Sequence, residues 1–162
     1  MSEEKQYTIA EANKYFAVKF NNAIWPLLEK PGKTEEENNE LINLAHASLL
    51  HWSKRPDCKK INLQRGEYMI AVAYTEAKRK EPALYHAKRC KAITNEDPEE
   101  NDDFDLPYSL LALAGAFYLN GFKEEADKYL EEAQKLGDSI KGEVDKKIFM
   151  EDLRSCLKMN EK

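Results

Sequence analysis

Turn-forming residues are scarce in this sequence, with only 6 Gly and 6 Pro among 162 residues, whereas 34% of the chain is charged and 42% is hydrophobic. A protein built from many short strands needs a turn every few residues, and glycine and proline supply most turns. The composition therefore favours long helices, and we predict an all-α fold.

Long apolar runs and cysteine pairs are absent as well. No window holds the roughly 18 consecutive apolar residues that a membrane-spanning helix needs, and the first residues, MSEEKQYT, lack the basic-then-apolar order of a secretory signal. Cys58, Cys90 and Cys156 are odd in number and form no C-x-x-C pair, which favours reduced thiols over a disulfide framework or a zinc site. These features predict a cytoplasmic location.

Charge is distributed unevenly along the chain. Residues 1–50 carry a net charge of −3, residues 51–91 of +7 and residues 92–162 of −9. A basic middle can dock an acidic partner, but solvated helix faces produce the same pattern. With a sequence pI of 5.4 and no nucleic-acid-binding motif, the chain gives little support to DNA or RNA binding.

Hydrophobic periodicity predicts seven helices. Two of them begin with a capping box, in which a threonine hydroxyl and a glutamate three residues later exchange hydrogen bonds with each other's backbone amides. These pairs are Thr8 with Glu11 and Thr34 with Glu37, and Asp57 is the expected N-cap of the third helix. The expected helices cover about 9–28, 34–54, 58–78, 82–93, 106–120, 123–136 and 143–158.

Residues 94–105, TNEDPEENDDFD, carry seven acidic side chains and a proline. We predict a solvated loop between packed hairpins. A hard-cation site is the alternative, but calcium loops alternate carboxylates around a glycine, and this segment contains no glycine.

Two central hairpins share one pattern of small and large residues. In the later hairpin Ala126 is followed by Leu130 and Ala133, and Phe117 lies nine residues before Ala126. The earlier hairpin repeats these spacings 43 residues upstream, with Ala83, Ala87 and Cys90 preceded by Tyr74; Ala71 and Ala114 match on the first helices.

This pattern resembles the tetratricopeptide repeat, whose usual period is 34 residues. Nine extra residues separate the two copies, and the acidic segment accounts for them. Glu67 and Ala87 depart from the family pattern, which favours a large apolar and an aromatic residue at these positions. A narrower resemblance, to short bacterial tetratricopeptide-like proteins of unassigned role, rests on His51-Trp52 and on the string from His86 to Cys90.

The resemblance implies one domain over residues 1–162, a right-handed stack of antiparallel hairpins forming a short α-solenoid. Residues 1–56 would be an N-terminal hairpin without repeat signature, residues 57–140 two repeat-like units, and residues 141–162 a helix that caps the stack. Such arrays hold other molecules, so a non-enzymatic module that binds a protein or peptide is the leading expectation.

In this architecture the first helix of each pair lines the concave face. Here that face would be aromatic and apolar with one cation, which suits an amphipathic helix or an extended peptide. It lacks the Lys and Asn residues with which related repeats clamp chaperone tails, and the chain's own first or seventh helix could also fill it. The expected partner-binding residues are Arg65, Tyr68, Val72, Thr75, Tyr108, Leu111, Gly115 and Tyr118.

A polar cluster of His51, His86, Cys90 and Asp105 is the alternative site, for zinc or a small ligand. Cys90 also occupies a core position of the repeat, where a thiol behaves as a small hydrophobe. No catalytic motif or glycine-rich phosphate loop is present, so we expect no enzymatic activity and no cofactor. A third possibility is a structural homodimer formed through one exposed end of the stack.

Overall fold

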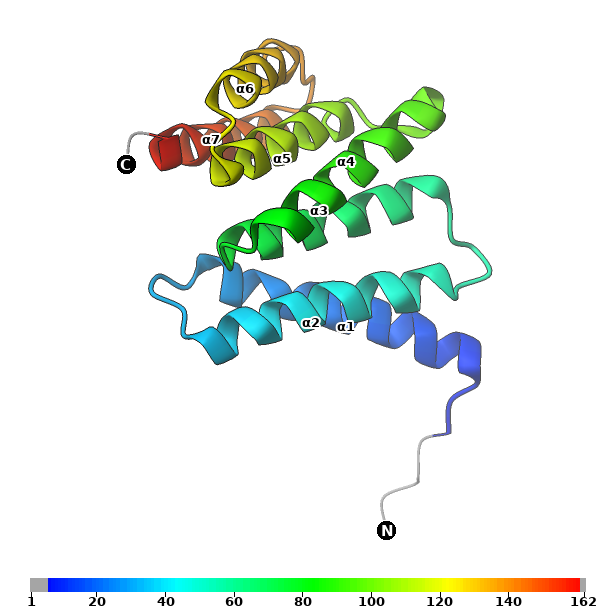
Figure 1. Ribbon diagram of the computed structural model, residues 1–162. Helices are drawn as coiled ribbons and strands as arrows, with labels where there is room; N and C mark the ends of the chain where they lie inside the picture. Colours follow the sequence, from blue (N-terminus) through cyan, green and yellow to red (C-terminus); the bar gives the residue numbers. More distant parts are fainter. Residues whose placement is uncertain (1–5, 161–162) are drawn as a thin grey trace.

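The structure, a computed structural model, describes residues 6–160 (Figure 1). Within this range the chain is entirely helical and contains no strand, which confirms the all-α prediction. Seven α-helices and one short 3-10 helix follow in the order α1 (Ile9–Glu29), α2 (Glu35–Ser53), α3 (Lys60–Glu76), α4 (Lys80–Glu96), η1 (Pro98–Glu100), α5 (Asp105–Asn120), α6 (Lys123–Gly137) and α7 (Glu143–Asn160).

Both predicted capping boxes are present. The Glu11 amide donates to the Thr8 hydroxyl (3.2 Å), and the Thr8 amide donates to the Glu11 carboxylate (2.8 Å). Thr34 and Glu37 form the same pair of bonds, at 3.2 and 3.0 Å. Local sequence therefore determines where α1 and α2 begin.

The predicted start of the third helix is wrong by two residues. Asp57 is not an N-cap; its carboxylate binds the Arg55 guanidinium, with an Nε–Oδ1 distance of 2.9 Å. The N-cap of α3 is Lys59, whose amide donates to the side-chain oxygen of Asn62 (2.9 Å). A short-range ion pair thus removes the aspartate that the sequence offered as a cap.

The acidic segment also departs from the expectation of a solvated loop. α4 continues to Glu96, and the 3-10 helix follows one residue later. The Asn101 amide group donates to the carbonyl of Thr94 (2.8 Å), which ties the segment to the end of α4. Asp105, expected in the loop, is the first residue of α5 and is buried.

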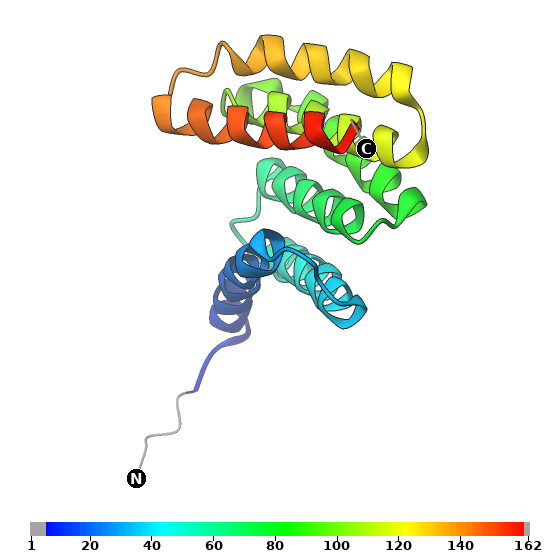
Figure 2. The same cartoon turned by 90° about the vertical axis from the view of Figure 1, so that its left-hand side faces the viewer.

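Helices that are neighbours in sequence pack against each other. α1 packs on α2, α3 on α4 and α5 on α6, while α2 also contacts α3 and α4 also contacts α5 (Figures 1 and 2). α3 and α5 touch directly, and α7 lies against both α5 and α6. One core cluster joins α1, α2 and α3 around Ile24 and Ile70, and another joins α5, α6 and α7 around Leu110 and Phe149.

The turns of the α3–α4 and α5–α6 hairpins are equivalent at an offset of 43 residues. Lys78 and Gly121, 43 apart, both have left-handed backbones, with φ of 57° and 83°. The backbone amides of Lys78 and Gly121 donate to the carbonyls of Thr75 and Tyr118, both at 3.0 Å. The next amides along the chain, those of Arg79 and Phe122, donate to the carbonyls of Tyr74 and Phe117, at 2.9 and 3.0 Å. The register read from the small residues is therefore also the register of the turns.

Small residues lie where helices approach closely. Ala71, Ala83, Ala114 and Ala126 are each at most 1% exposed. Gly137 is the last residue of α6 and does not have a left-handed backbone. A Cβ at Gly137 would lie 2.1 Å from Cε1 of Phe149, so this glycine makes room for α7.

Candidate functional site

A groove of about 410 Å³ runs across one side of the molecule. Every residue that lines it belongs to α1, α3, α5 or α7, which are the first helices of the three hairpins and the final helix. α3 and α5 form its floor, and α1 and α7 contribute from either end. The lining residues are Trp25, Leu28, Glu29, Tyr68, Met69, Val72, Thr75, Glu76, Leu111, Ala112, Gly115, Asp152, Ser155 and Cys156.

Part of the predicted concave face lines this groove. Tyr68, Val72 and Thr75 of α3 and Leu111 and Gly115 of α5 are among its lining residues. The structure thus brings these five positions together, and their role in binding a partner stays a prediction.

The two other predicted tyrosines are engaged by neighbouring helices. The Tyr108 hydroxyl donates to Asp152 of α7 (2.8 Å), and its ring meets that of Phe149 at a centroid distance of 5.0 Å. Tyr118 donates to Asp127 of α6 (2.5 Å). Burial and the neighbouring carboxylate raise the pKa of each phenol. α7 therefore covers part of the face that the sequence assigned to a partner, and the groove is the part left open.

Arg65, the predicted cation of the concave face, is used to hold the acidic segment. Its Nε and Nη2 donate to the two carboxylate oxygens of Asp105, both at 2.9 Å, and Nη2 also reaches Asp102 at 2.5 Å. The paired Asp105 carboxylate is the main cause of the raised pKa of Arg65. Arg65 is not among the residues lining the groove.

The groove carries negative charge without a lining cation. Its charged lining residues are Glu29, Glu76 and Asp152, and no Lys, Arg or His is among the described residues that line it. Lys33 neutralises Glu76 across 3.1 Å. The Asp152 carboxylate accepts a hydrogen bond from the Tyr108 hydroxyl. Desolvation raises the pKa of the Asp152 carboxyl, and this effect exceeds the lowering caused by the Tyr108 hydrogen bond.

The four residues of the predicted polar cluster have different main partners. His51 donates from Nδ1 to Asn13 of α1 (2.8 Å) and packs against Phe16 and Phe20. Cys90 is fully buried, and burial raises the pKa of its thiol to about 12. Gln64 lies between Cys90 and Asp105: its side-chain nitrogen is 3.5 Å from the Cys90 sulfur and 3.4 Å from the Asp105 carbonyl oxygen. The Asp105 carboxylate is bound by Arg65 as described above. Cys90 and Asp105 are therefore neighbours, whereas His51 contacts α1.

His86 belongs to a different cluster, which the sequence did not predict. Its Nδ1 donates to the Glu67 carboxylate (2.6 Å), and the Nε of Arg89 donates to the other oxygen (2.9 Å). The His46 ring lies 5.4 Å from the His86 ring, and its Nε2 is 3.0 Å from the Tyr74 hydroxyl. One available signal was Glu67 itself, an acid among apolar residues of α3, with His86 and Arg89 three residues apart on the facing helix.

Metal binding gains no support from these clusters. Within residues 6–160 no group of three or more His, Cys, Asp or Glu side chains is arranged to hold a metal ion. In the Glu67 cluster both carboxylate oxygens already accept hydrogen bonds from cationic or ring nitrogens. The cluster is therefore built to join α2, α3 and α4.

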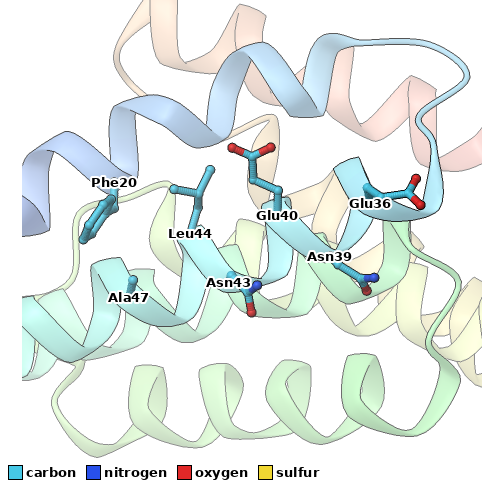
Figure 3. A pocket seen from close by; sticks show the side chains of 7 residues that line it. All are labelled: Phe20, Glu36, Asn39, Glu40, Asn43, Leu44 and Ala47. Carbon is cyan, nitrogen blue, oxygen red and sulfur yellow. The ribbon is translucent and has the colours of Figure 1, made fainter.

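A second hollow, on the surface of the α1–α2 hairpin, is shallow and does not converge on any point (Figure 3). Its polar side chains come from successive turns of α2, and Figure 3 shows Glu36, Asn39, Glu40 and Asn43 spread along that helix and not directed at a common point. The lining residues are Phe20, Glu36, Asn39, Glu40, Asn43, Leu44 and Ala47. This arrangement offers no fixed set of ligands.

None of the helices within residues 6–160 combines the length and apolar character needed to span a bilayer. Comparisons with family models, curated proteins and solved structures find no match to this chain.

Proposed function

We propose that this chain is a non-enzymatic interaction module that binds a protein or peptide in the groove between α1, α3, α5 and α7. The observation that carries the proposal is that all residues lining the groove come from alternate helices of the chain, α1, α3, α5 and α7. A row of alternate helices makes an extended concave surface, and such surfaces are used to hold extended or helical segments of partners.

The proposed architecture is a right-handed, tetratricopeptide-like stack of hairpins in which α7 is the capping helix. Equal turns at an offset of 43 residues support two equivalent units. The direct contact of α3 with α5 supports side-by-side first helices, and the burial of four matching alanines supports close packing between units. In this proposal residues 1–56, 57–140 and 141–162 form one domain.

The apolar character of the groove favours binding over chemistry. Trp25 is 47% exposed at its edge, and Leu28, Val72 and Leu111 add aliphatic surface. Cys156, the lining thiol, is mostly buried, and burial raises its pKa to about 11, so it is not activated as a nucleophile. The proposal includes a cytoplasmic location, in keeping with three free cysteines.

The test uses selection of peptides from a displayed random library, followed by affinity measurements on variants. Gly115→Leu fills the groove from its floor, where a Cβ would contact Thr75 and Cys156 only at 3.7 and 3.9 Å. Tyr85→Ala removes an exposed aromatic from α4, outside the groove, and is the matched control. We expect Gly115→Leu to weaken binding at least about tenfold and Tyr85→Ala to leave it unchanged.

Equal binding of the selected peptides to wild type and Gly115→Leu would contradict the proposal, provided that circular dichroism shows both to be equally helical. Loss of binding in Tyr85→Ala alone would place the interaction on α4 instead.

A further inference from the structure

We propose that the partner segment held in the groove is cationic: a short peptide stretch with large apolar side chains flanked by lysine or arginine that pairs with Asp152 and Glu29. This inference rests on the proposed function and adds the chemistry of the partner.

The first observation is the sign of the lining charges. The chain as a whole has 25 basic and 30 acidic side chains, so a random surface would mix both signs. The groove has three carboxylates and no lining cation among the described residues. Clefts lined by one sign of charge concentrate the field and favour partners of the opposite sign.

The second observation is that two of these carboxylates have no cation of their own. Lys33 pairs with Glu76 at 3.1 Å, but no ion pair within residues 6–160 involves Glu29 or Asp152. Glu29 is the last residue of α1 and Asp152 belongs to α7, and these two helices lie at opposite ends of the row of helices (Figure 1). A partner that bridges the groove would meet one carboxylate on each side.

Asp152 is exposed, so a cation of a partner can reach its carboxylate. Its carboxylate lies beside the Tyr108 ring and hydroxyl and at the margin of an apolar floor. A lysine or arginine would pair with this carboxylate, and charge-assisted hydrogen bonds are stronger than those between neutral groups.

The third observation is the exposed tryptophan. Trp25 lines the groove, as Leu28 and Met69 do, and remains 47% exposed. Tryptophan is prominent among residues that dominate binding energy when a partner covers them. The groove volume lies near the lower end of ligand pockets, about 300–1,000 Å³, and so admits a few side chains of a partner.

Trp25 also supplies the readout. The other tryptophan, Trp52, lies under the Arg55 guanidinium at 4.0 Å and does not line the groove. In a Trp52→Phe background, emission therefore reports on Trp25 alone. The probes are two capped synthetic peptides with one leucine pattern, LKKLLKLLKKLLKL and LEELLELLEELLEL.

We expect the lysine peptide to shift Trp25 emission and to bind at least about tenfold more tightly than the glutamate peptide. Asp152→Asn and Glu29→Gln should each weaken the lysine peptide about three- to tenfold and reduce its salt dependence. Asn at position 152 can still accept the Tyr108 bond, and Glu29 is exposed, so neither change should unfold the protein. Glu132→Gln, which removes an exposed charge on α6, is the matched control and should have no effect.

Equal affinity for both peptides, with binding still blocked by Gly115→Leu, would overturn the inference and leave the proposed function intact. Selection of predominantly acidic peptides from the random library would have the same meaning. If the lysine peptide binds without changing Trp25 emission, and Glu132→Gln weakens it as much as Asp152→Asn, it binds the acidic surface at large and the inference fails. Failure of the proposed function itself is recognised separately, because the selected library peptides would then bind wild type and Gly115→Leu equally well.

Discussion

The Nδ1 of His86 lies 2.6 Å from a carboxylate oxygen of Glu67, within the packing of α3 against α4. Glu67 is only 5% exposed, and Arg89 occupies its second oxygen. Burial opposes ionisation of Glu67, but the His86 and Arg89 hydrogen bonds together hold its pKa below the usual value. A buried position in the packing of α3 against α4 is here used for a charged link between helices.

Replacing Glu67 alone should destabilise the fold, because His86 would lose its charged acceptor inside the helix interface. We expect Glu67→Gln to lower the free energy of unfolding by about 2 kcal/mol, measured by urea denaturation. The double variant Glu67→Met/His86→Leu should recover much of this loss, since apolar packing can replace a buried ion pair. A double variant less stable than Glu67→Gln would show that the ionic link has no apolar substitute here.

Acid should weaken the contact between α2 and α4 through His46. Burial, and then repulsion by a protonated His86, lower the pKa of His46 below 6.5 in the folded protein, while Glu67 acts in the opposite direction. The folded state therefore binds fewer protons than the unfolded state. Stability from this group is fully present above about pH 6.5 and is lost as pH falls through the folded pKa.

The measurement is the free energy of unfolding at several pH values between about 5 and 8. We expect wild type to gain stability with rising pH up to about 6.5, and His46→Gln, which can still bond Tyr74, to show a flatter profile in that window. Glu67 contributes a further loss below about pH 4.5, which both proteins should share. If the free energy of unfolding changes with pH by the same slope in both proteins above pH 5, His46 is not the cause of the pH dependence.

The equivalent left-handed residues Lys78 and Gly121 should respond in opposite directions to substitution. A side chain in this conformation costs about 1 kcal/mol relative to glycine. Lys78→Gly should therefore raise the free energy of unfolding by roughly that amount, and Gly121→Lys should lower it by a similar amount. Thermal and urea denaturation of the two single variants and their combination test this, since the combined change should nearly cancel. Destabilisation by Lys78→Gly would mean that the lysine side chain contributes more than its backbone costs.

Alanine substitutions at Gly137 and Gly115 should change stability in opposite directions, because close packing dominates at Gly137 and helix propensity at Gly115. A Cβ at Gly137 would overlap the Phe149 ring at 2.1 Å, whereas one at Gly115 would meet nothing closer than 3.7 Å. We expect Gly137→Ala to cost about 1–2 kcal/mol, and Gly115→Ala to gain about 0.5–1 kcal/mol because alanine favours the helix. The double variant Gly137→Ala/Phe149→Leu should lose less stability than the sum of the losses in the two single variants. Strict additivity in that double variant would argue against the close approach of α6 and α7.

Local sequence determined most of the helices of this protein. Threonine and glutamate three residues apart define the starts of α1 and α2, and apolar periodicity with the small residues located the hairpins and their 43-residue register. These signals act within one turn of helix or between adjacent helices, so they can be read from the chain alone. Where a short-range competitor was present, as Arg55 is for Asp57, even a local prediction was wrong.

Tertiary structure decided how the side chains of distant helices are used. Arg65 and Asp105 are 40 residues apart, Tyr108 and Asp152 are 44 apart, and nothing in the sequence near either member indicates its partner. Arg65 and Tyr108, which form these pairs, do not line the groove, whereas Asp152 does. A side chain's partners depend on which helix faces come together, and that is settled by the packing of all seven helices within residues 6–160.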